Sequence, residues 1–186
     1  TYSTVQIGDQ CWFAENCRYL PEVMPSSDAS TSDPAYYVYG YEGTSVWAAQ
    51  STTNYETYGV LYNWTAAMSE DICPSGWHIP SDGEFTQLTS FLGGSSVAGG
   101  KMKEAGYDHW LTPNTGATNS SGFTGLPGGY LYPGIFLFEG ERGILWSSSE
   151  TGFPNSWSRE IDYDMGDVFP HASNRYLGFS ARCLQD

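Results

Sequence analysis

The stretch that decides the fold reads Cys73-Pro-Ser-Gly-Trp-His-Ile-Pro-Ser-Asp-Gly-Glu-Phe85, and a second stretch near the end of the chain reads Gly178-Phe-Ser-Ala-Arg-Cys183. The first supplies a cysteine, a rigid turn and a helix start, because Ser81 and Glu84 form a capping box. An apolar stripe follows at helical spacing and Gly93-Gly94 ends the helix. The two stretches predict that the end of the chain returns to its middle.

The chain has four cysteines, which allow three pairings. We expect Cys11 to pair with Cys17, closing a short local loop, and Cys73 to pair with Cys183, tying the chain end to the middle. The longer loop would contribute on the order of 4 to 5 kcal/mol in the chain-entropy model. Four buried free thiols are the alternative.

Composition bounds the class of protein. A chain of 186 residues is long enough for one buried core, so we expect a single domain over residues 1–186. Aromatic residues make up 16 % and charged residues only 15 %, and there are 22 glycines, which favours a turn-rich, aromatic-packed globule. The net charge of −14 would repel phosphate backbones and anionic lipid surfaces, so nucleic acid is not expected as a partner. No run of eighteen apolar residues occurs, so direct membrane insertion is not expected either. Cysteines and many small polar residues are typical of an extracellular or cell-surface protein.

Local patterns predict an α+β fold with two helices and many short strands. Residues 4–14 alternate on both sides of a Gly-Asp turn, which indicates a hairpin. Residues 60–68 place apolar side chains on one face of a short first helix, and residues 81–92 form the second. A strand is expected at 36–41, a loop at 21–35 and a polar excursion at 42–57. Further strands are expected at 130–132, 135–138, 144–146 and 177–182.

Seven ordered blocks run nearly from end to end of the chain. They are Val5-Gln-Ile-Gly with Cys11-Trp-Phe-Ala-Glu-Asn16; Tyr58-Gly-Val-Leu-Tyr-Asn-Trp64; Cys73-Pro-Ser-Gly-Trp-His-Ile-Pro-Ser81; Gly99-Gly-Lys-Met-Lys103; Gly122-Phe-Thr-Gly-Leu-Pro-Gly-Gly129; Leu145-Trp-Ser-Ser-Ser-Glu150; and Gly178-Phe-Ser-Ala-Arg-Cys183. In these blocks the chain resembles the Fibrobacter succinogenes major paralogous domain family. The resemblance implies a divergent C-type-lectin-like fold, in which two helices flank short twisted antiparallel strands with long irregular loops and the terminal strands pair.

The third block is also similar to formylglycine-generating enzymes, which share that broad fold. The copper-binding cysteine pair by which those enzymes oxidise their substrate has no evident counterpart, and the sequence has no nucleophile elbow and no zinc-ligand spacing. His78 is interpreted as a structural histidine, and Ser147–Ser149 as capping or strand-pairing residues. We therefore expect no enzymatic activity.

Three carboxylates lie within six residues, at Asp162, Asp164 and Asp167. They supply enough hard oxygen ligands for a calcium ion if a loop folds around it, although the spacing is not that of an EF-hand. A solvated acidic turn is the alternative. The sugar-binding motifs of calcium-dependent C-type lectins are absent.

Residues 151–176 are the predicted ligand face, as the terminal region is in the C-type-lectin-like fold. Trp157, Arg159, Ile161 and Val168 match framework positions, so the alternating side chains should face outward. These mix aromatic rings with short polar groups, as recognition surfaces do. The candidate ligand-binding residues are Phe153, Asn155, Ser158, Glu160, Asp162, Asp164, Phe169, His171, Asn174 and Tyr176. Ordinary polar loops are the alternative.

These observations predict an extracellular ligand-binding or adhesion module, joined to other domains of a larger bacterial surface or secreted protein, that recognises a glycan or a protein. Two alternatives stay open. One is an oxidase or hydrolase related to formylglycine-generating enzymes, and the other is a calcium-stabilised structural spacer of an adhesin.

Overall fold

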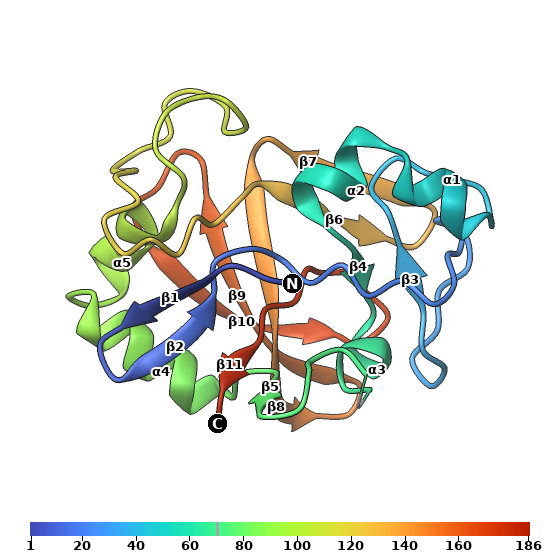
Figure 1. Ribbon diagram of the computed structural model, residues 1–186, viewed down its shortest axis with the longest axis horizontal. Helices are drawn as coiled ribbons and strands as arrows, with labels where there is room; N and C mark the ends of the chain where they lie inside the picture. The colour runs from blue at the N-terminus through green and yellow to red at the C-terminus, as the bar shows by residue number, and fades with distance from the viewer. Residues whose placement is uncertain (70) are drawn as a thin grey trace.

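The computed structural model describes residues 1–69 and 71–186 and combines short helices with three small sheets (Figure 1). The strands are β1 (Thr4–Ile7), β2 (Gln10–Phe13), β3 (Tyr36–Tyr37), β4 (Leu61–Tyr62), β5 (Trp77–His78), β6 (Gly128–Tyr132), β7 (Ile135–Glu139), β8 (Arg142–Gly152), β9 (Asn155–Asp162), β10 (Val168–Asn174) and β11 (Leu184–Gln185). The helices are α1 (Val46–Gln50), α2 (Thr53–Tyr58), α3 (Trp64–Ala67), α4 (Asp82–Phe91) and α5 (Ser95–Met102). The expected mixture of helix and strand is confirmed.

The first sheet joins the two ends of the chain to its middle. Its strand order is β1-β2-β11-β5, and the β1–β2 hairpin turns at Gly8 with a positive φ of 61°. On the last strand, Leu184 lies opposite Trp12 on one side and opposite His78 on the other. The predicted hairpin and the pairing of the terminal strands are therefore confirmed, and Figure 1 shows β11 between β2 and β5.

The second sheet has the order β10-β9-β8-β6-β7. Strands β8, β9 and β10 form a continuous antiparallel meander, in which residues 142–152 pair with 155–162 and residues 155–161 pair with 168–174. The region predicted as the ligand face, residues 151–176, is thus mostly strand. Small polar and larger residues alternate along β9, which is the two-residue period of a β-strand.

Five short helices lie in the described part of the chain, where the sequence predicted two. Helix α4 begins at the predicted capping box, with both reciprocal hydrogen bonds of Ser81 and Glu84 present. The predicted helix over residues 60–68 divides into β4 and α3. Helices α1 and α2 occupy the expected polar excursion, and each begins at a Ser or Thr N-cap. No helix within residues 1–69 and 71–186 is long and apolar enough to cross a membrane.

One of the two predicted disulfides is present. Cys73 and Cys183 are bonded, with Cα atoms 5.8 Å apart, whereas Cys11 and Cys17 are free thiols. The predicted pairing of Cys11 with Cys17 is wrong. Cys11 lies in the hairpin opposite Gln6, while Cys17 is completely buried and donates its backbone N–H to the carbonyl of Ala181.

The core is divided into two main apolar clusters. The first surrounds Trp146 and contains the three cysteines Cys17, Cys73 and Cys183. The second surrounds Trp12 and holds the inward face of α4 against β8 and β9 and that of α5 against β10. Both tryptophans are completely buried, as the aromatic-rich composition predicted.

Candidate functional site

Strand β9 has two faces with different environments. Arg159 and Ile161 are buried on the face that α4 covers, and the Arg159 guanidinium lies 2.7 Å from the Asp82 carboxylate of that helix. Val168 of β10, opposite Ile161, is buried with them, and Trp157 is half-buried on the same face. The framework role predicted for these four residues fits their positions. Side chains alternate along a strand, so Ser158 and Glu160 point to the opposite face.

That opposite face forms one wall of a groove of about 250 Å³. Strand β6 and the segment 176–179 form its other walls. The lining residues are Tyr130, Tyr132, Arg142, Ile144, Ser158, Glu160, Ser173, Tyr176, Leu177 and Phe179. We call this the sheet groove.

Polar side chains meet at the floor of the sheet groove. One Glu160 oxygen lies 3.6 Å from Arg142 Nε, and the other lies 3.7 Å from His171 Nε2. Both separations exceed a direct hydrogen bond, and no described residue donates one to this carboxylate. Arg142 also lies 3.2 Å from Asp162, and its Nε has no well-aligned acceptor. Glu160 therefore keeps hydrogen-bonding capacity for a ligand, and so do the terminal nitrogens of Arg142, whereas the Arg142 Nε is itself buried.

Aromatic rings form the walls. Tyr130 packs edge-on against Phe179 with ring centroids 5.8 Å apart, and Tyr132 packs edge-on against Tyr176 at 6.3 Å. Burial raises the pKa of both Tyr130 and Tyr176 above the ordinary tyrosine value, so both hydroxyls stay protonated at neutral pH. The rings thus offer apolar faces with hydroxyl donors at their edges.

The structure brings some of the predicted ligand-binding residues together and separates others. Ser158, Glu160 and Tyr176 line the sheet groove, and register places Phe169 and His171 of β10 opposite Glu160 and Ser158. Ser158 is completely buried, with its hydroxyl 2.8 Å from that of Ser173, so it supports the wall. The remaining predicted residues lie elsewhere: Asn155 pairs with Asn174 at the far end of the strands, Phe153 is 77 % exposed at the β8–β9 turn, and Asp164 is exposed in the β9–β10 turn.

Sequence reasoning missed seven of the ten residues that line the sheet groove. Tyr130 and Tyr132 lie in an aromatic run that was correctly predicted as a strand, but nothing local placed that strand beside β8. Arg142 follows a Gly-Glu turn and carried no recognisable motif. Its guanidinium stacks 4.3 Å from the Phe138 ring, on the other side of the turn between β7 and β8.

The predicted calcium ligands lie around a loop that already holds a cation. Lys103 Nζ donates hydrogen bonds of 2.7 and 2.8 Å to the carbonyls of Asp162 and Met165. Burial and the nearby Asp164 carboxylate raise the pKa of Asp162. Among residues 1–69 and 71–186, no group of three or more His, Cys, Asp or Glu side chains is placed to hold a metal ion. Calcium binding through Asp162, Asp164 and Asp167 stays a prediction.

His78 and the Ser147–Ser149 run have the structural contacts that the sequence suggested. His78 Nδ1 lies 2.7 Å from the Asp186 carboxylate, and Nε2 lies 3.0 Å from that of Glu84. Ser149 Oγ accepts a 2.9 Å hydrogen bond from the Asp82 N–H, in the first turn of α4. Burial raises the pKa of the Cys17 thiol to about 12, which opposes the reactive thiolate that an oxidase would need.

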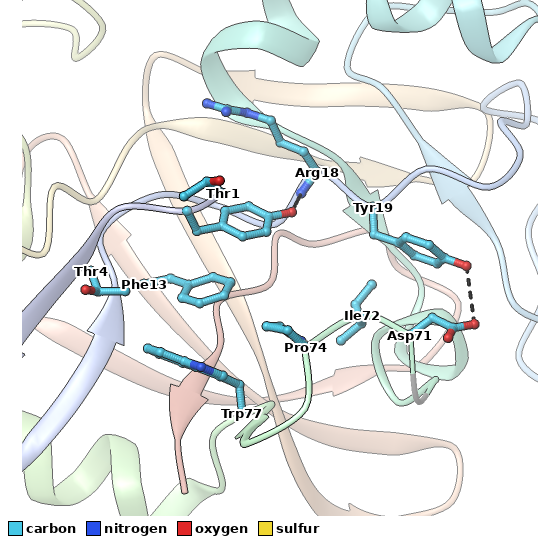
Figure 2. Close-up of a pocket in the computed structure, with 10 residues that line it drawn as sticks. Thr1, Thr4, Phe13, Arg18, Tyr19, Asp71, Ile72, Pro74 and Trp77 are labelled. Carbon is cyan, nitrogen blue, oxygen red and sulfur yellow. Dashed lines mark hydrogen bonds between the residues drawn. The ribbon is translucent and has the colours of Figure 1, made fainter.

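A second, larger concavity of about 460 Å³ lies beside the first sheet, and sequence reasoning did not anticipate it (Figure 2). Phe13 and Trp77 form one side of it with ring centroids 4.7 Å apart, and Figure 2 shows Tyr19 across from them. The Tyr19 hydroxyl donates to Asp71 at 3.3 Å. Segment 71–77, which contains Cys73, supplies much of the wall. We call this the terminal pocket.

Comparison with known proteins gives a family match. The family model described as the Fibrobacter succinogenes major domain matches residues 5–185 of the chain. No curated protein and no solved structure gave a significant match.

Proposed function

The chain belongs to the Fibrobacter succinogenes major domain family, as its seven sequence blocks predicted, and we propose that it is a non-enzymatic extracellular module of a larger bacterial protein that binds a glycan in the sheet groove. One observation carries this proposal. The sheet groove gathers tyrosine rings around a carboxylate and a guanidinium that have no complete set of hydrogen bonds within the described chain.

This combination suits the chemistry of a sugar ring. A pyranose has an apolar C–H face that packs on an aromatic ring, and hydroxyls at its edge that both donate and accept hydrogen bonds. Glu160 would accept from two hydroxyls, while Arg142 would donate to a third. The volume of about 250 Å³ is small for a ligand site, which favours recognition of a single sugar unit.

Charge limits the class of glycan. The chain carries 21 acidic and 7 basic side chains, so a polyanionic glycan would be repelled at long range. Glu160 in the sheet groove and Asp162 beside it offset the charge of Arg142, which leaves no net positive site for a uronate or sulfate. We therefore propose a neutral glycan as the ligand.

A glycan array followed by titration calorimetry tests this proposal. Glu160→Gln should weaken binding roughly 10- to 100-fold, because a hydrogen bond to a charged group is worth about 1.5 to 3 kcal/mol. Tyr132→Ala should also weaken it through lost stacking. Asp108→Asn and Tyr107→Ala are the matched controls, since both residues are exposed and lie outside the sheet groove.

The proposal would be contradicted by no binding to any glycan, or by binding that both groove variants leave unchanged. Capture of a surface protein in place of a glycan would also overturn it. A parallel series with a chelator tests calcium. A chelator-sensitive melting temperature without glycan binding would favour the structural-spacer alternative.

A further inference from the structure

Three of the four cysteine sulfurs meet at one point in the core. Cys183 is bonded to Cys73, and the free Cys17 Sγ lies 3.5 Å from Cys183 Sγ. The backbone fixes this approach, because Cys17 N–H donates to Ala181 at 2.9 Å and Phe13 N–H donates to Cys183 at 3.0 Å. Cys17 is therefore held beside the disulfide by main-chain hydrogen bonds on both sides of the contact.

We propose that Cys183 exchanges its disulfide partner between Cys73 and Cys17. The Cys17 thiolate attacks the Cys183 sulfur, the Cys17–Cys183 bond forms, and the Cys73–Cys183 bond breaks. Cys73 leaves as a thiolate and takes up the proton that Cys17 lost. The chain holds one disulfide before and after the step, so no oxidant or reductant is consumed.

Exchange would remove the covalent link between segment 71–77 and Cys183. Ile72, Pro74 and Trp77 of this segment line the terminal pocket, and Figure 2 shows them beneath Phe13 and Tyr19. In the observed state the disulfide joins this segment to Cys183 through Cys73, which lies between Ile72 and Pro74. In the exchanged state the segment would keep its β5–β11 pairing near Trp77 but would lose its covalent anchor at Cys73. The wall of the terminal pocket would then be free to move.

The packed structure keeps the exchange slow. Burial raises the pKa of the Cys17 thiol to about 12, although the nearby Arg182 guanidinium acts in the opposite direction. At neutral pH the thiol is therefore protonated, and attack requires local opening that admits water. Cys73 lies at the wall of a neighbouring depression that Trp77 and His78 also line, so the released thiol would be open to alkylation.

Non-reducing peptide mapping by mass spectrometry tests the proposal on the whole oxidised chain. The protein is incubated in urea below its unfolding midpoint, quenched with acid and alkylated. We expect a Cys17–Cys183 linked peptide to appear while the Cys73–Cys183 peptide falls and Cys73 becomes alkylated, at one disulfide per chain throughout. Cys11→Ser should behave like the wild type, and Cys17→Ser should keep only Cys73–Cys183.

The Cys73→Ser variant gives a second, independent measurement. When it is refolded under oxidising conditions, Cys17 should pair with Cys183 and Cys11 should stay free. A folded variant in which Cys17 and Cys183 both stay free would overturn the proposal. If this variant does not fold, the wild-type experiment still decides: alkylation of Cys17 at every urea concentration, with Cys73–Cys183 intact, overturns the proposal.

Discussion

Two buried cations in this acidic chain are held mainly by backbone carbonyls. Arg182 donates to the carbonyls of Phe123 and Thr124 and to the Asn16 side chain, and its guanidinium lies over the Phe123 ring. Burial lowers the pKa of Arg182 to about 9. Lys103 is also completely buried, with its ammonium on the carbonyls of the β9–β10 turn. A buried charge is tolerated when it is hydrogen-bonded, so these cations fix the loops that they bridge.

Lys103 gives a prediction about pH. Burial lowers its pKa from 10.5 to about 8, against the opposing effect of Asp162 and Asp164. Between these two values the unfolded chain binds more protons than the folded chain, so the stability contributed by this site rises as the pH rises from about 8 to 10.5. Lysine-specific carbon-13 NMR can follow the titration, because the chain has only two lysines. A Lys101→Arg variant assigns the signals. A Lys103 midpoint near the unperturbed value of about 10.4 would contradict the prediction.

His78 gives a second prediction about pH, with the opposite sign. Burial lowers its pKa, but hydrogen bonds to Asp186 and Glu84 outweigh this and leave it raised above 6.5. The ion pairs of His78 with Asp186 and Glu84 therefore stabilise the fold most below pH 6.5, and this stabilisation is lost as the pH rises through the pKa that His78 has in the folded state. Since His78 is partly exposed, His78→Gln should cost only about 0.5 to 1 kcal/mol at pH 6 and less at pH 8. Urea unfolding at the two pH values measures this, with His171→Gln as control. An equal loss at both would refute it.

At the scale of elements, helix α4 depends on its N-terminal cap. Ser81 Oγ accepts from the Glu84 N–H, and the Glu84 carboxylate accepts from the Ser81 N–H at 2.7 Å. Ser81→Ala removes one half of this reciprocal pair and should lower the free energy of unfolding by about 1 kcal/mol. Chemical denaturation measures the loss. Ser90→Ala, at an exposed position inside the same helix, should change little, and an equal effect of the two substitutions would rule out the cap as the cause.

The same contrast shows which elements the sequence could predict. Helix α4 was predictable because its cap and apolar stripe are local. Helix α5 was not, because it begins at Gly94 without a side-chain cap and contains Gly99 and Gly100. Those glycines are needed for close packing: a Cβ would lie 2.1 Å from the Asp167 carbonyl oxygen at Gly99 and 2.3 Å from that of Gly116 at Gly100. At these two positions the close approach of other backbone segments outweighs the low helix propensity of glycine.

The candidate site follows the same rule. The alternation along β9 was readable from residues 155–162, so Glu160 and Ser158 were correctly placed on one face. Arg142 and Tyr132 come from strands that join this face only through the sheet order, which no local pattern encodes. The position of Cys17 beside Cys183 likewise depends on a contact across 166 residues, and for that reason the local pairing with Cys11 was the wrong prediction.

At the scale of the whole molecule, strand pairing and a disulfide both join the end of the chain to its middle at the same place. The last strand pairs with both β2 and β5, and the Cys73–Cys183 disulfide lies directly beside it, one residue before β11 begins. The N-terminal hairpin, the start of α4 and the C-terminus thus form one unit. In this unit His78 links Glu84 to Asp186, and Asp186 N–H donates to the Gly76 carbonyl at 3.1 Å.

Reduction of the disulfide should therefore destabilise the whole fold and not one end of it. The bond closes a loop with a sequence separation of 110, and the chain-entropy model assigns such a loop on the order of 4 to 5 kcal/mol. We expect the free energy of unfolding to fall by this amount on reduction, which lowers the urea midpoint. Tryptophan fluorescence and far-ultraviolet circular dichroism should both report the same single cooperative transition. Cys11→Ser should show the same fall, because Cys11 is not in the bond. An unchanged midpoint would mean that the noncovalent pairing of β11 alone closes the fold. Separate transitions by the two probes would mean that the first sheet unfolds independently of the second sheet.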